Sequence, residues 1–202
     1  MNRPLNISKA ITMIELIVSM LIVSIVVLSF YSMQTFSHGQ VVNSERRSKI
    51  QNELTYAIEH MSKYVHQAVG NMNNHAIVST AAGFKVRVDL GIPQTPSSLV
   101  DTWITYTLSG NTLSVACSGS VNCPFVTEEL SNRIIDNFVA DTLMPINPAN
   151  GFYVKVDPLG ALVDIGLVGR YNPLIAYSAL TKSTNPQVEI KTKVICSNCS
   201  VN

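Results

Sequence analysis

The pattern of hydrophobic and polar positions begins with one long apolar run. Residues 11–31 are apolar almost throughout, with a few Ser and Thr and one formal charge, Glu15. As a helix with a rise of about 1.5 Å per residue, this run would be about 32 Å long, which matches the hydrocarbon thickness of a bilayer. We therefore expect a membrane-spanning helix over residues 11–33.

A second helical pattern follows the apolar run. Beyond Val41, apolar residues recur mostly at steps of three or four, and charged residues fill the positions between them. This periodicity is typical of a helix with one buried face and one solvated face. The recurring apolar residues are Val42, Ile50, Leu54, Ile58, Met61, Val65 and Ala68 (or Val69). The sequence thus predicts an amphipathic helix over residues 34–70.

The two helical segments are expected to be continuous. No proline occurs between Pro4 and Pro93, and Gly70 followed by Asn71 is a suitable stop signal. A break at Gly39 is the alternative, and it would separate a membrane anchor from an independent soluble helix.

Residues 71–202 show a different pattern, in which short alternating runs are separated by turn residues. Such alternation is typical of half-buried strands. The predicted strands cover residues 84–90, 103–108, 112–116, 152–156, 161–168 and 188–194. Ser109-Gly110-Asn111 predicts a hairpin between the second and third strands, whereas residues 130–141 fit either a helix or a strand. We expect an α+β fold, with the long helix packed on one mainly antiparallel sheet.

Composition limits the range of functions. The 202 residues carry 14 basic and 13 acidic side chains, a net charge of +1 with no clustered basic face, which argues against nucleic acid as a partner. Charged residues make up 13% of the chain, against roughly 25% in average soluble domains. This low charge suits a protein that buries much of its surface in a membrane or against neighbouring subunits.

Glu15 distinguishes three interpretations of the apolar run. A carboxylate inside a membrane helix costs about 2.5–3.5 kcal/mol on insertion scales, so it requires an explanation. A secretory signal would have a shorter apolar core and a small-x-small cleavage site, and a plain anchor would not explain the charge. A cut between Ala10 and Ile11 would create an amine four residues from Glu15, on the same helix face, where the two charges offset each other.

This arrangement resembles the N-terminal signature of type IV prepilins. That family has a short basic leader, a cut after a small residue and an F-T-L-I-E-L type start, here Lys9, Ala10 and I-T-M-I-E-L from Ile11. The family usually has Gly before the cut and Phe after it, where this chain has Ala10 and Ile11. The resemblance implies that prepilin peptidase removes the leader, residues 1–10, that the amine of Ile11 is methylated, and that Glu15 acts in filament assembly.

The helix and strand patterns that follow the apolar run are similar to those of minor pilins and pseudopilins of the PilW and GspJ type. The similarity rests on the amphipathic helix, on an I-x-Y-x-L-x-G-N-x-L hairpin at residues 104–113 and on a final strand at residues 188–195. It implies a structural subunit near the tip of a type IV pilus or type II secretion pseudopilus, with other minor and major pilins as partners. It also implies a single-pass protein of the bacterial inner membrane with residues 71–202 outside the cytoplasm, which later joins a filament in the periplasm or at the cell surface.

The four cysteines are compatible with several chemistries. Their spacing, with a CxxC pair, could indicate zinc or redox chemistry. The expected topology places them outside the cytoplasm, where disulfides persist. Local bridges, Cys117–Cys123 and Cys196–Cys199, are favoured, while crossed bridges, a metal site and free thiols stay open.

Catalytic motifs are not found in the sequence. It contains no HExxH, G-x-S-x-G or phosphate-binding loop, and His60 and His66 are too far apart along the helix to share a face well. The acidic residues Asp136, Asp141, Asp157 and Asp164 lack the spacing of a calcium loop. We expect a non-enzymatic structural subunit without a metal or cofactor. The alternatives are a membrane-anchored module that binds an extracytoplasmic ligand, or a pilus-tip adhesin.

Overall fold

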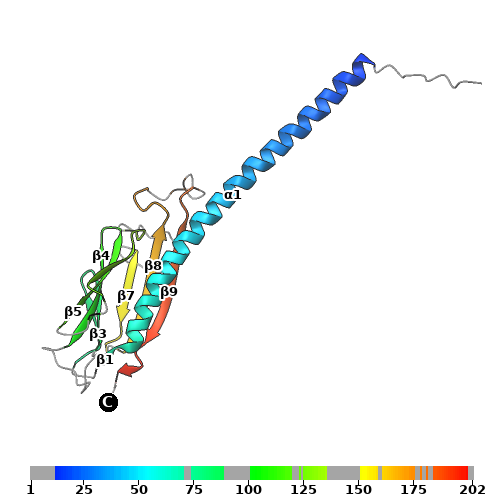
Figure 1. Ribbon diagram of the computed structural model, residues 1–202. Coiled ribbons are helices and arrows are strands. Elements are labelled where there is room, and N and C mark those ends of the chain that lie inside the picture. The colour runs from blue at the N-terminus through cyan, green and yellow to red at the C-terminus, as the bar shows by residue number, and fades with distance from the viewer. Residues whose placement is uncertain are drawn as a thin grey trace, which may run out of the picture. The chain divides into compact units, whose positions relative to one another are not determined.

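The computed structural model describes residues 12–70, 74–88, 101–119, 123, 125–135, 151–158, 161–175, 178, 181 and 184–199. The leader, with Ala10, and Ile11 lie outside these residues, as do residues 91–98 and 136–141. The chain divides into two compact units, residues 1–42 and residues 43–202. Figure 1 shows the long helix and the strands that follow it.

The helix α1 (Met13–Gln67) is continuous through Gly39, so the alternative of a break at that glycine is wrong. It ends at Gln67, three residues before the predicted stop at Gly70, because Val69 and Gly70 instead form a short strand, β1 (Val69–Gly70). This strand pairs in parallel with β10 (Asn198–Cys199), so the chain leaves the helix directly into a β ladder.

The predicted amphipathic pattern in the second half of α1 is confirmed. Its buried side chains recur at steps of three and four, as expected for one helix face. They are Ile50, Leu54, Ala57, Ile58, Met61, Tyr64 and Val65. Together with Ala68, which follows the helix, these residues belong to one core cluster with the inner faces of the strands.

The first sheet is built from consecutive antiparallel strands. It contains β2 (Ile77–Thr80), β3 (Gly83–Val88), β4 (Thr102–Ser109), β5 (Thr112–Ser118) and β6 (Thr127–Ser131), in that order. The predicted hairpin at residues 103–116 is confirmed: β4 and β5 are joined at Gly110, whose φ of 56° favours glycine. Side chains alternate along β4 between buried and half-buried, as its sequence predicts.

The second antiparallel sheet contains three strands. They are β7 (Phe152–Val156), β8 (Leu162–Arg170) and β9 (Gln187–Ile195), with β8 in the centre. All three were predicted from alternation or from their flanking turns. The ladders are regular, so residues that lie opposite each other across the three strands share a face of the sheet.

The prediction of a single sheet is wrong. Among the described residues the strands form the five-stranded sheet, the three-stranded sheet and the parallel β1–β10 pair. β7 meets the first sheet through side chains, with the Phe84 and Phe152 rings 6.3 Å apart between centroids, rather than through a shared ladder. The described part of residues 130–141 is extended: Leu130 lies in β6, and Ile134 forms an isolated bridge with Gly169.

Candidate functional site

The first half of α1 presents an apolar surface on all sides. Every described residue from Thr12 to Val41 is exposed, including large side chains such as Met13 at 83% and Phe30 at 69%. A helix that is hydrophobic all round requires lipid or partner protein around it, because contiguous apolar surface of this extent is rare in water. By length and composition, α1 is suited to cross a membrane.

Hydroxyl groups in this half of α1 are satisfied within the helix itself. Five of them donate to the carbonyl oxygen four residues earlier, so these five hydroxyls do not require water. The bonds run from Ser19 to Glu15 (2.7 Å), Ser24 to Met20 (2.8 Å), Ser29 to Ile25 (2.8 Å), Ser32 to Leu28 (3.0 Å) and Thr35 to Tyr31 (2.9 Å). These Ser and Thr residues are therefore compatible with an apolar environment.

Glu15 lies in the first turn of α1. Its backbone N–H donates to the carbonyl oxygen of Thr12 over 3.1 Å, and the N–H of Leu16 donates to the same oxygen over 3.2 Å. A carboxylate at this end of a helix interacts favourably with the helix dipole. Within the described residues its carboxylate has no ion pair or side-chain hydrogen bond.

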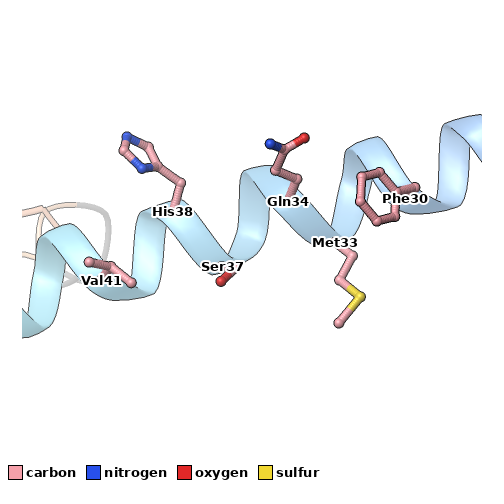
Figure 2. A pocket seen from close by; sticks show the side chains of 6 residues that line it. All are labelled: Phe30, Met33, Gln34, Ser37, His38 and Val41. Carbon is pink, nitrogen blue, oxygen red and sulfur yellow. The ribbon is translucent and has the colours of Figure 1, made fainter.

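A shallow hollow follows further along this half of α1 (Figure 2). Its lining residues lie at steps of three and four, on one helix face, and they are Phe30, Met33, Gln34, Ser37, His38 and Val41. Gln34 and His38 are the first amide and imidazole after the apolar run. The surface of α1 thus becomes polar here, before the amphipathic half begins.

Both local disulfides are present. Cys117 is bonded to Cys123 and Cys196 to Cys199, with Cα–Cα distances of 5.6 Å in each pair. The crossed bridges, the zinc site and the free thiols are therefore wrong. The Cys117–Cys123 loop contains Gly119, whose φ of 145° and close approach to the Thr102 backbone require a glycine. The Cys196 side chain is buried beside the end of α1, with its Sγ 3.1 Å from the carbonyl oxygen of Ala68.

Charged residues on the amphipathic half do more than face solvent. The Arg133 Nε lies 3.0 Å from a carboxylate oxygen of Glu53, and Arg133 also stacks on the Tyr171 ring with its guanidinium carbon 5.0 Å from the ring centroid. Arg46 stacks on the same ring at 4.9 Å and donates to the carbonyl oxygen of Thr184. These contacts tie α1 to the segment after β8, which helical periodicity alone does not predict.

His60 lies in an aromatic cluster rather than on a catalytic surface. Its ring centroid is 5.0 Å from that of Tyr64, 5.6 Å from Phe125 and 5.9 Å from Tyr106. Its Nδ1 is 3.1 Å from the Tyr106 hydroxyl. Burial lowers the pKa of His60, and burial also raises the pKa of Tyr106 well above its ordinary value. The cluster joins three elements that are distant in sequence, so no local pattern could have revealed it.

The remaining candidate residues do not gather into one cluster. His66 is exposed, with its Nδ1 3.5 Å from the Ser197 hydroxyl, and Asp164 lies opposite Lys193 on the three-stranded sheet. Asp136 and Asp141 lie outside the described residues. Among the described residues there is no group of three or more His, Cys, Asp or Glu side chains that could hold a metal ion.

No protein-family model, curated protein or solved structure matches this chain.

Proposed function

We propose that this protein is a minor pilin or pseudopilin, a non-enzymatic structural subunit of a type IV pilus or type II secretion pseudopilus. The observation that supports this most directly is the first half of α1, which exposes apolar side chains on every face and carries a single carboxylate, Glu15, in its first turn. A surface of this kind suits two successive environments: lipid before assembly, and the packed helices of a filament core afterwards.

The leader keeps the precursor in the bilayer in this proposal. Residues 1–10 stay on the cytoplasmic side, where their basic residues agree with the positive-inside tendency. Prepilin peptidase then cuts after Ala10, and the new amine of Ile11 is methylated. Because five hydroxyls in the apolar half of α1, from Ser19 to Thr35, are already bonded within the helix, transfer from lipid to protein leaves them satisfied.

Glu15 sets the register of packing in the proposed filament. Its carboxylate neutralises the N-terminal amine of its own subunit or of a neighbour. In an apolar core an unpaired charge is strongly destabilising, so a subunit in the wrong register would be rejected. Support for this role comes from the lack of any side-chain partner for Glu15 among the described residues.

The β-rich part, from residue 71 onward, contacts other minor and major subunits near the filament tip in this proposal. Its two disulfides agree with a location outside the cytoplasm, where oxidised cysteines persist. The protein is then a single-pass inner-membrane protein before assembly, and a filament subunit in the periplasm or at the cell surface afterwards.

N-terminal peptide analysis and intact-mass measurement of the protein from its native membrane test the proposal. A chain that begins with N-methylated Ile11 is expected. A chain that retains residues 1–10 would overturn pilin-type processing and would favour the alternative, a membrane-anchored module that binds an extracytoplasmic ligand.

A further inference from the structure

The outer face of the three-stranded sheet contains a hollow of about 400 Å³. Its lining residues come from all three strands and are Tyr153, Asp164, Ile165, Lys191, Thr192 and Lys193. The hollow lies on the face opposite α1: Gly169 of β8 faces the helix, and Gly166, three positions earlier, points the other way. Its volume is within the range of roughly 300–1,000 Å³ that is typical of small-molecule sites.

Gly166 lies between Tyr153 and Lys191, two of the lining residues, in the ladders of the three-stranded sheet. Its φ lies outside the left-handed region, and a Cβ at this position would make only ordinary contacts, 3.6 Å from the Lys191 Cγ and 3.6 Å from the Tyr153 Cβ. A glycine inside a strand weakens the strand and often marks a place where another molecule approaches closely. With no side chain on Gly166, the nearest groups above the sheet at this point are the Tyr153 and Lys191 side chains, both of which line the hollow.

Two rows of residues, each running across the three strands, supply the chemical groups around the hollow. Tyr153, Gly166 and Lys191 lie opposite one another in one row, and Lys155, Asp164 and Lys193 in the next. The tyrosine supplies an aromatic wall. The second row supplies an acceptor, the Asp164 carboxylate, between two ammonium donors.

The charges around the hollow largely offset one another. The Lys191 Nζ lies 2.7 Å from a carboxylate oxygen of Glu189, and the Lys193 Nζ lies 3.4 Å from a carboxylate oxygen of Asp164. A strongly anionic ligand would meet Asp164 and Glu189, and a cationic ligand would meet three lysines. One third of the Asp164 side chain is still exposed and can accept a hydrogen bond.

We propose that this hollow binds a neutral sugar ring of a glycan. Sugar hydroxyls both donate and accept hydrogen bonds, so they can use the carboxylate of Asp164 and the ammonium groups of Lys191 and Lys193 together. The apolar face of the ring packs on the Tyr153 side chain, which lines the hollow. This inference does not rest on the proposed filament function, because it concerns the β-rich unit alone.

Ligand-observed saturation-transfer NMR on the full chain tests this inference, in micelles of a detergent without a sugar headgroup. The probes are neutral methyl pyranosides of glucose, galactose and mannose together with N-acetylglucosamine, and methyl glucuronide serves as the charged comparison. At least one neutral sugar is expected to bind. Gly166→Leu, which adds a branched side chain between Tyr153 and Lys191, and Asp164→Asn, which weakens the acceptor, are each expected to weaken that binding at least tenfold.

Two matched variants separate the hollow from general effects. Gly166→Ala adds only a Cβ in ordinary contact and is expected to retain binding within about threefold. Glu129→Gln removes a carboxylate from the exposed side of β6 and is expected to leave binding unchanged. If Gly166→Leu fails to fold, Asp164→Asn decides the outcome.

Three outcomes would overturn the inference: no neutral sugar binds, only the charged glucuronide binds, or binding survives both Gly166→Leu and Asp164→Asn. A changed self-association of Gly166→Leu without sugar binding would assign the hollow to a neighbouring protein instead, and would also overturn it. None of these outcomes bears on cleavage before Ile11, so the proposed function stands or falls separately.

Discussion

Gly169 of β8 lies directly against Leu54 of α1, and a Cβ on this glycine would be 3.1 Å from the Leu54 Cδ2. The same Cβ would also be 3.1 Å from the Ile50 Cγ2. Figure 1 shows the second half of α1 running along β8. The glycine thus sets how closely the helix approaches the three-stranded sheet.

Gly169→Val should destabilise the β-rich unit by about 1–3 kcal/mol, because the added methyl groups overpack a contact that is already tight. The free energy of unfolding, measured in urea on the full chain in detergent, checks this expectation. Gly166→Ala, on the same strand but facing away from α1, is the control and should change that free energy by less than about 0.5 kcal/mol. Equal stability of the Gly169→Val variant and the wild type would show that the helix is free to move away.

The protonation of His60 should make the fold sensitive to mild acid. Burial lowers the pKa of His60 below its ordinary 6.5; the nearby Lys63 acts in the same direction and Glu128 opposes it. Above pH 6.5 the imidazole is neutral in both the folded and the unfolded chain. The free energy of unfolding is therefore not reduced by protonation of His60. Below pH 6.5 the unfolded chain takes up the proton more readily, so stability falls until the lower folded pKa is reached.

Urea unfolding between pH 7.5 and pH 5 checks the role of His60. The loss of stability on acidification should be smaller in His60→Gln than in the wild type. His66→Gln, which changes an exposed histidine one and a half turns further along α1, should retain the wild-type dependence. An identical pH profile in His60→Gln and the wild type would exclude the imidazole as the source.

Glu15→Ala should spare membrane insertion and weaken filament assembly, because removing the one charge in the apolar half makes insertion easier but leaves the N-terminal amine unpaired. The measurements are membrane fractionation and the amount of the subunit in sheared filaments or in cross-linked minor-subunit complexes. Glu45→Ala removes an exposed carboxylate on the same helix and should leave both unchanged. Normal assembly of Glu15→Ala would remove the register role from the proposal.

The ion pair between Arg87 and Asp101 should be far more sensitive to mutation than the surface pairs. The Arg87 Nη1 lies 2.9 Å from the Asp101 Oδ2, and the two side chains are only 3% and 2% exposed. Asp101→Ala leaves the guanidinium buried without this partner, which should cost about 3–5 kcal/mol of unfolding free energy.

The exposed pair of Asp164 and Lys193 provides the comparison for Asp101. Asp164→Ala should cost less than about 1 kcal/mol, because both partners are open to solvent. Urea denaturation of both variants gives the two values. Similar losses in both variants would mean that burial does not amplify the Arg87–Asp101 interaction.

The sequence was most informative where structure depends on near neighbours. The steps of three and four in the second half of α1 follow from helix geometry, and the buried residues Ile50, Leu54 and Ile58 occupy the predicted face. The β4–β5 hairpin depends on the turn at Gly110 and on alternation in its two strands, all of which are local. Local spacing also favoured the two disulfides that the structure contains.

Features that depend on distant pairing were not predictable. β2 is four residues long and β6 is mostly polar, so neither shows a clear alternation, and the division into two sheets follows from which strands pair. The aromatic cluster unites His60, Tyr106 and Phe125 from separate parts of the chain. Gly166 reads in sequence only as a weak point in a strand, and its position between Tyr153 and Lys191 is visible only once the strands are paired.

The pairing of β1 with β10 affects the timing of biogenesis. β1 follows α1 directly, but its partner residues, Asn198 and Cys199, are synthesised after every other described strand. The end of α1 therefore cannot acquire its ladder, or the neighbouring Cys196–Cys199 bridge, until residues 198 and 199 have left the ribosome and, in the proposed topology, crossed the membrane. A chain stalled during export would lack the β1–β10 pair and the Cys196–Cys199 bridge. These two features would therefore distinguish a fully exported chain from a stalled one.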